Sequence, residues 1–251
     1  MLIQHPALQG ATEHYADMST HKPLRVVAQL RPGAHVVSYD PVNLDSLLCW
    51  AVMHEATQGA GLPNTPEPYA LPAPLSVLWR NDDYLPLYAA QSFYPVGESA
   101  SDVHYYHKRA PEGQFSKPNA KDGSMRIETI KGRWMERRIP VPTFTTLEIE
   151  AFCVGDANEN ARLLHLVSHV GKRRATGMGE VAAWRVSCAS EFKVWRDWPE
   201  GRKLVKSLPF AAASALKLEC AGEVSLCGWT PPQWLPSAQL AGWREGAAVV
   251  S

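Results

Sequence analysis

The sequence lacks an excess of charge of either sign, because 25 Lys and Arg balance 25 Asp and Glu. The chain as a whole therefore exerts no attraction on a polyanion, and any site for nucleic acid must be local. It also lacks an apolar run long enough to span a bilayer and a signal-peptide pattern at the N-terminus. We expect a cytoplasmic protein with no membrane partner.

Cysteine is scarce and poorly arranged for zinc. The five cysteines are odd in number and no two have CxxC spacing, and most lie in apolar periodic segments typical of reduced core thiols. Neither a metal nor another cofactor is expected, although Cys220 and Cys227 with a distant histidine remain a possible ligand set.

The most informative segment that is present runs from Gly171 to Gly179. It holds three glycines and three cations in nine residues, namely Gly171, Lys172, Arg173, Arg174, Gly177 and Gly179. Glycine allows positive φ and a close approach of the backbone to a ligand, and successive N–H groups in such a turn can bind an anion. The pattern predicts a phosphate-binding loop.

The order of elements around this loop excludes one mechanism. Apolar residues at helical spacing precede it and a strand pattern follows it, whereas nucleotide-binding loops run strand, loop, helix. An anion here would depend on the three cations to outweigh the negative end of the preceding helix. The alternative is ordinary helix termination by Gly171.

A second basic feature is a polar, aromatic segment at 97–142, which we expect to be an insertion with its tip at 118–123. Within 104–138 there are nine Lys and Arg against four Asp and Glu. A neutral protein that gathers its positive charge in one hairpin has a candidate polyanion contact. The alternative is a solvated surface extension.

Hydrophobic periodicity predicts an α+β fold. The predicted strands are 24–30, 75–93 (a hairpin counted as one irregular strand), 144–154 and 180–188, and the predicted helices are 44–57 after Asn43 and 157–170 after Asp156 or Asn158. The resulting βαββαβ order is that of the ferredoxin-like, RRM-like fold.

We expect three regions along the chain. They are an N-terminal arm at 1–23, a core at 24–188 and a C-terminal extension at 189–251. The extension contains Trp195, Trp198, Trp229, Trp234 and Trp243, and it either wraps the sheet or forms a small second lobe.

This arrangement resembles the RAMP superfamily of CRISPR RNA-binding proteins. The segments that carry the resemblance are Leu24 to Leu30, the Asn43-Leu44-Asp45-Ser46-Leu47-Leu48 helix start, the loop from Gly171 to Gly179, and Trp229 to Trp234. Together they are most similar to the small subunit of type IV effector complexes that holds the 5′ handle of the guide RNA.

The resemblance implies a noncatalytic subunit that caps one end of a guide ribonucleoprotein in antiviral defence. Its implied partners are the guide RNA, repeated backbone subunits and a large subunit, with target DNA reached indirectly. The insertion at 97–142 corresponds to a thumb-like projection.

The candidate RNA-binding residues are those of the loop and the cations of the insertion, Lys108, Arg109, Arg133, Arg137 and Arg138. Aromatic side chains among these cations are candidate platforms for unstacked bases, namely Tyr105, Tyr106, Phe115 and Trp134.

Three rival functions remain open. A metal-independent CRISPR RNA-processing endoribonuclease on the same fold would use His104, Tyr105, His107 and Lys108 as acid, base and cation. A metal enzyme would use His165 and His169, which are four residues apart but have no glutamate between them. A nonspecific nucleic-acid module is the third.

Overall fold

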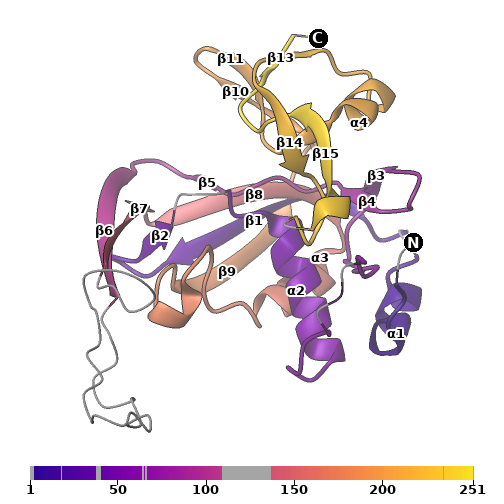
Figure 1. Ribbon diagram of the computed structural model, residues 1–251, viewed down its shortest axis with the longest axis horizontal. Helices are drawn as coiled ribbons and strands as arrows, with labels where there is room; N and C mark the ends of the chain where they lie inside the picture. The colour runs from indigo at the N-terminus through magenta and orange to yellow at the C-terminus, as the bar shows by residue number, and fades with distance from the viewer. Residues whose placement is uncertain are drawn as a thin grey trace, which may run out of the picture.

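A four-stranded antiparallel sheet forms the centre of the computed structural model, which describes residues 3–17, 19–37, 41–63, 65, 67–108, 137–233 and 235–250 (Figure 1). The strand order is β5-β8-β1-β9, with bounds Tyr94–Pro95, Glu148–Gly155, Lys22–Leu30 and Val181–Cys188. The predicted strands at 24–30 and 180–188 are confirmed. The fold is mixed α/β, with mostly antiparallel sheets and few helices in the described ranges.

Two helices cover one face of this sheet, α2 (Leu44–Ala56) and α3 (Ala157–Leu164). Alternate residues of β1 point toward them, and Leu24, Val26 and Ala28 are completely buried. The main core therefore lies between the helices and the sheet. None of the helices in the described ranges is long and apolar enough to cross a bilayer.

The N-terminal arm contains a helix that the sequence did not predict, α1 (Pro6–His14). Only Leu8 of this helix is buried, so the sequence of the arm has no sustained hydrophobic periodicity from which a helix could be predicted. Pro6 stands in its first turn, where the missing N–H has no cost. Tyr15 beyond its end donates a hydrogen bond to Glu159 of α3 at 3.2 Å, so the arm is packed on the core.

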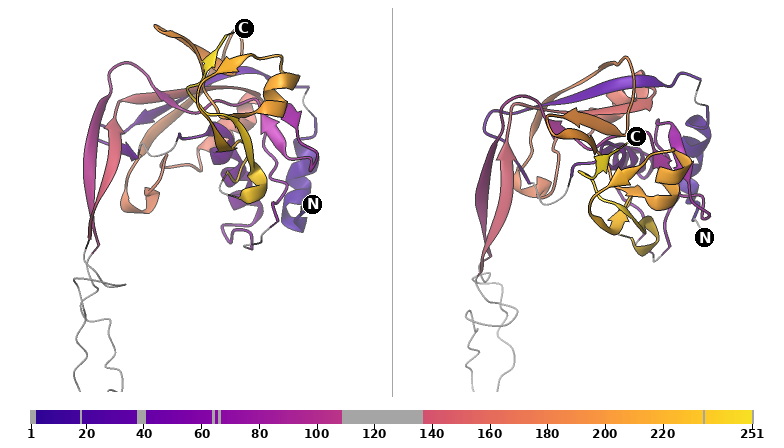
Figure 2. Two further views of the ribbon diagram at one scale, coloured as in Figure 1. Left: turned by 45° about the horizontal axis from the view of Figure 1, so that its top comes forward. Right: turned by 90° about the horizontal axis from the view of Figure 1, so that it is seen from above.

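The insertion forms a long antiparallel hairpin of β6 (Ala100–Lys108) and β7 (Arg137–Thr145), extended by β2 (His35–Val37). It projects from one end of the molecule (Figure 2). The expected tip at 118–123, and with it Arg109, Phe115, Arg133 and Trp134, lies outside the described residues.

Two predicted boundaries are wrong. The helix expected over 157–170 ends at Leu164. Backbone groups after this residue form hydrogen bonds with β9 instead of continuing the helix, and the carbonyl of Val167 accepts from Trp184 Nε1 at 2.8 Å. The strand expected over 144–154 is divided between β7 and β8. Thr146 at the break turns its hydroxyl to the carbonyl oxygen of Glu98 at 3.1 Å.

The expected hairpin in 75–93 is present as β3 (Val77–Arg80) and β4 (Pro86–Tyr88), joined by antiparallel pairing. β3 and β4 themselves do not lie in the central sheet, where β5 is the strand beside β8. The residues that flank the hairpin do pair with β8, as expected for this segment, through isolated bridges of Leu75 to Gly155 and Ala90 to Cys153. Leu85 and Leu87 of this hairpin pack instead with the C-terminal part of the chain.

The C-terminal residues form a small lobe with its own hydrophobic cluster around the fully buried Trp229. Its elements are β10 (Trp195–Trp198), β11 (Gly201–Leu204), β12 (Leu208–Pro209), α4 (Phe210–Ala215), β13 (Cys220–Ala221), β14 (Val224–Gly228), η2 (Pro236–Ala238), β15 (Gln239–Trp243) and β16 (Ala248–Val249). Of the two possibilities raised by the sequence, the structure thus has the second lobe.

Charged groups join this lobe to the core at two places. The ammonium of Lys206 pairs with the carboxylate of Asp45 in α2, and both side chains are less than a tenth exposed. On the other side of the sheet, Arg25 and Arg196 both contact the buried Glu150 carboxylate. The two pairs that reach the lobe, Lys206 with Asp45 and Arg196 with Glu150, link residues far apart in the sequence.

We predict that Lys206→Met lowers the free energy of unfolding by about 3–5 kcal/mol, because it leaves the Asp45 carboxylate buried without its cation. Denaturant unfolding of the purified protein measures the change. Lys203→Met is the matched control: its ammonium pairs with Glu200 at the surface, and we expect a loss below about 1 kcal/mol. The double variant Asp45→Leu with Lys206→Met should recover most of the loss. Equal effects of the two single variants would contradict this.

Candidate nucleic-acid interface

The glycine loop is closed at its neck by backbone hydrogen bonds. The N–H of Val170 donates to the carbonyl of Gly179 at 2.8 Å, and the N–H of Gly179 donates to the carbonyl of His35 at 2.8 Å. The loop is therefore anchored both to itself and to β2. Because α3 ends at Leu164, no helix C-terminus directly precedes the loop, and the unfavourable helix dipole expected from the sequence is not at its base.

All three glycines of the loop have positive φ, as predicted, with values of +79° at Gly171, +81° at Gly177 and +70° at Gly179. Only Gly179 is also sterically closed: a Cβ there would lie 2.0 Å from the carbonyl oxygen of Val170. A Cβ on Gly177 would meet nothing within 4 Å. Arg173 adopts the same left-handed region, with φ +60°.

The loop cations reach two neighbouring elements. The guanidinium of Arg173 lies over the ring of Tyr106 in β6, 4.5 Å from its centroid. The guanidinium of Arg174 lies over the ring of Trp50 in α2 at 5.1 Å. In the described part of the chain, neither group forms an ion pair with a carboxylate. Both charges thus remain open to an anionic ligand.

The hairpin cations are distributed on two faces. Successive side chains of a strand point to opposite faces, so Tyr106 faces the glycine loop and Tyr105 faces away from it. Arg138 lies over Tyr105 at 3.8 Å, on that far face. The backbone of Arg137 pairs with that of Lys108 at the end of the ladder. Arg109 and Arg133 lie outside the described residues, as does the side chain of Lys108.

The residues of the ribonuclease hypothesis are divided by the same alternation. His104 shares the face of Tyr106, with its ring centroid 5.9 Å from that of His35. Tyr105 and His107 occupy the opposite face. The candidate acid and base groups therefore do not converge on one point of the described hairpin.

The structure does not place the two histidines of the metal-enzyme hypothesis on one helix. His165 and His169 no longer share a helical face, because α3 ends before them. Within the described ranges, no three His, Cys, Asp or Glu side chains gather as a metal site would require. Burial raises the pKa of the Cys49 thiol in α2 well above its usual value.

Sequence reasoning missed one residue of this interface, Trp50. The signal was present: the apolar positions of the predicted helix, such as Leu44, Leu48 and Val52, define a buried face that excludes it. An aromatic residue off the buried face of a helix is available for contacts elsewhere.

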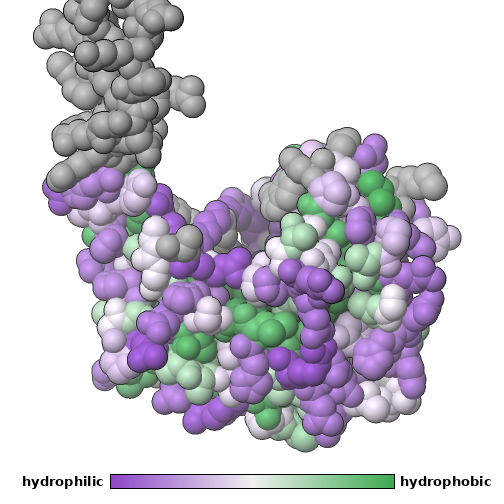
Figure 3. Space-filling view, turned by 90° about the horizontal axis from the view of Figure 1, so that it is seen from below, coloured by the Kyte–Doolittle hydropathy of each residue, from purple (hydrophilic) through white to green (hydrophobic). Residues whose placement is uncertain are grey.

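The surface is hollowed between the hairpin and the rest of the molecule, and hydrophobic side chains gather there among hydrophilic ones (Figure 3).

We predict that Gly179→Ala destabilises the protein more than Gly177→Ala does. Both changes place alanine in a left-handed conformation, at a cost of about 1–2 kcal/mol. At Gly179 the backbone must also move away from Val170, which adds about 1–3 kcal/mol. Thermal or denaturant unfolding of the two variants makes the comparison. Equal losses would mean that the neck of the loop is open rather than closed by Val170 and Gly179.

A family described as CRISPR type IV associated protein Csf3 matches residues 22–217. The match covers the central sheet, the hairpin, the glycine loop and the first part of the C-terminal lobe. No curated protein matches the chain.

Proposed function

We propose, because this chain belongs to the Csf3 family of CRISPR type IV associated proteins, that it is the noncatalytic subunit that holds the 5′ handle of the guide RNA. Family membership supports a place in a CRISPR complex with other Csf subunits. The handle-binding role is our inference. It would cap one end of a type IV effector ribonucleoprotein, beside repeated backbone subunits and a large subunit, and would reach target DNA only indirectly.

We further infer that the core is ferredoxin-like, as in RAMP proteins. The sheet order β5-β8-β1-β9 supports this, with α2 between β1 and β5 in the chain and α3 between β8 and β9. In this interpretation the β6–β7 hairpin is the thumb-like projection.

One observation carries the proposal: in the described part of the chain, the two arginines of the glycine loop lie against aromatic rings rather than carboxylates. Arg173 over Tyr106 and Arg174 over Trp50 combine positive charge with flat apolar faces. Cations bind phosphates without reading sequence, and aromatic faces stack on unpaired bases. Single-stranded RNA presents both groups at each nucleotide, so it matches this surface better than a duplex whose bases are covered.

The arrangement of the loop cations also supports the proposal that this neutral chain binds a polyanion. Lys172, Arg173 and Arg174 are adjacent in sequence, and the loop directs the two guanidinium groups toward different elements. The positive charge is thereby spread along a path from α2 to the hairpin. A single-stranded backbone has phosphates at regular intervals that can follow such a path.

We predict that Arg173→Ala and Arg174→Ala each reduce the slope of log affinity against log salt concentration by about 0.7, the value for one neutralised phosphate on a single strand. Filter binding or fluorescence anisotropy with single-stranded repeat RNA over a salt series measures this slope. Arg202→Ala is the control, because this arginine pairs with Asp197 in the C-terminal lobe at 3.5 Å. An unchanged slope in both loop variants would remove the loop from the RNA site.

We also predict that the full-length protein retains repeat RNA without cutting it. The protein is incubated with end-labelled repeat RNA in the absence of metal, and the RNA is separated by gel electrophoresis. Binding without shorter products is the expected result. Specific cleavage that is lost in His104→Ala would instead establish the processing endoribonuclease.

A further inference from the structure

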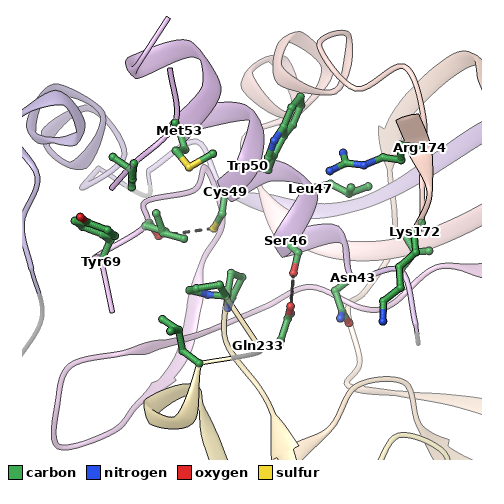
Figure 4. A pocket seen from close by; sticks show the side chains of 18 of the residues that line it. Asn43, Ser46, Leu47, Cys49, Trp50, Met53, Tyr69, Lys172, Arg174 and Gln233 are labelled. Carbon is green, nitrogen blue, oxygen red and sulfur yellow. Dashed lines mark hydrogen bonds between the residues drawn. The ribbon is translucent and has the colours of Figure 1, made fainter. Parts of the chain in front are cut away.

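A cavity of about 550 Å³ lies beside the glycine loop (Figure 4). Its walls come from α2 and the residues just before it, from the segment after α2, from the glycine loop and from the C-terminal lobe. The segment after α2 contributes Gly61, Leu62, Pro63, Thr65, Glu67, Tyr69 and Leu71, and the lobe contributes Pro231, Pro232, Gln233 and Leu235. The two cations Lys172 and Arg174 belong to its lining. The volume is in the range of pockets that hold a small organic ligand.

The walls are mainly apolar. Leu47, Trp50 and Met53 line the cavity from α2, at a spacing that places them on one face of the helix. Tyr69 lies across the cavity from Lys172 and Arg174, and Pro232 belongs to the C-terminal wall. A flat heterocycle can pack against such a wall of aromatic and aliphatic groups.

A few polar groups interrupt the apolar wall. The hydroxyl of Ser46 is hydrogen-bonded to the side-chain amide of Gln233, 2.9 Å from its Oε1 and 2.7 Å from its Nε2. Asn43 supplies a second carboxamide at the same end of α2. A carboxamide offers both a donor and an acceptor, which is the combination that reads the edge of a nucleobase.

The cavity has opposite characters at its two ends. Lys172 and Arg174 make one end cationic, near the N-terminus of α2, while Met53 and Tyr69 make the other end apolar. Among the described lining residues, Glu67 is the single carboxylate. A ligand with an anionic group attached to a flat, polar-edged ring matches this distribution.

We propose that this cavity takes one unstacked base of the bound RNA, with the flanking phosphates at Lys172 and Arg174 and the base edge at Gln233 and Asn43. The inference rests on the proposed RNA-binding function and adds to it a specific subsite. The base would lie between Trp50 and the C-terminal wall, so that the C-terminal lobe completes a site begun by the core. An apolar segment of a partner protein is the competing occupant.

The test uses the full-length protein and a synthetic copy of the 5′ end of the RNA that copurifies with it. Each nucleotide in turn is replaced by an abasic one, and affinity is measured by anisotropy. We expect one position at which loss of the base weakens binding by about 5- to 150-fold, the range for one stacked base. Other positions should show smaller changes.

A variant that fills the cavity tests whether the base of the sensitive nucleotide is the one that the cavity holds. Ser46→Trp, one turn from Trp50, should weaken binding of the intact RNA but leave binding of the sensitive abasic RNA unchanged. Ser214→Trp is the matched control, since Ser214 is an exposed serine of a helix away from the cavity. Thermal melting checks that both variants are folded. Gln233→Met is the milder second variant. It should partly reduce the factor by which the abasic substitution weakens binding.

The outcomes separate the two proposals. If no RNA copurifies and repeat RNA does not bind, both are overturned. The pocket proposal alone is overturned if RNA binds with the expected salt dependence on Arg173 and Arg174 but no abasic substitution weakens binding. It is also overturned if one abasic substitution weakens binding by the same factor in the wild type, in Ser46→Trp and in Gln233→Met. RNA affinity unaffected by Ser46→Trp, with loss of another subunit from the complex, would assign the cavity to a protein segment.

Discussion

The ion pair of Asp45 and Lys206 is the interaction on which the rest of the architecture depends, because it holds the C-terminal lobe against α2. Both charges are buried away from water, so each compensates the free-energy cost of desolvating the other. The cavity has one wall on α2 and another on the lobe, the two parts of the chain that this ion pair connects. Glu245 lies in the same junction, accepting hydrogen bonds from Ser92 and Tyr94, and burial raises its pKa above the usual value.

The glycine loop depends on a second constraint, the close approach of Val170 and Gly179. Their hydrogen bond ends the loop, and the absence of a side chain at Gly179 permits it. The same neck bonds to His35, which connects the loop to β2 and through it to the hairpin. The positions of Arg173 and Arg174 relative to Tyr106 and Trp50 therefore follow from backbone geometry as well as from charge.

A local cationic surface on a neutral protein has a functional consequence in a ribonucleoprotein. In the proposed function, charge confined to the loop and hairpin would direct RNA to one surface, whereas charge spread over the chain would attract it everywhere. The ion pairs elsewhere, such as Arg31 with Glu180 and Arg162 with Glu55, occupy most other guanidinium groups in the described ranges. A defined binding path is what a subunit with a fixed place in a complex requires.

The sequence by itself determined the local features: the strand of alternating apolar residues at Leu24 to Leu30, the helix from Leu44, and the positive φ at three glycines, because each depends on neighbouring residues. It also indicated the family, since the loop and helix motifs are local. Tertiary structure alone decided the early end of α3, the unpredicted α1, the pairing of Asp45 with Lys206 and the place of Trp50 beside Arg174. These depend on contacts between segments distant along the chain, for which local periodicity carries no information.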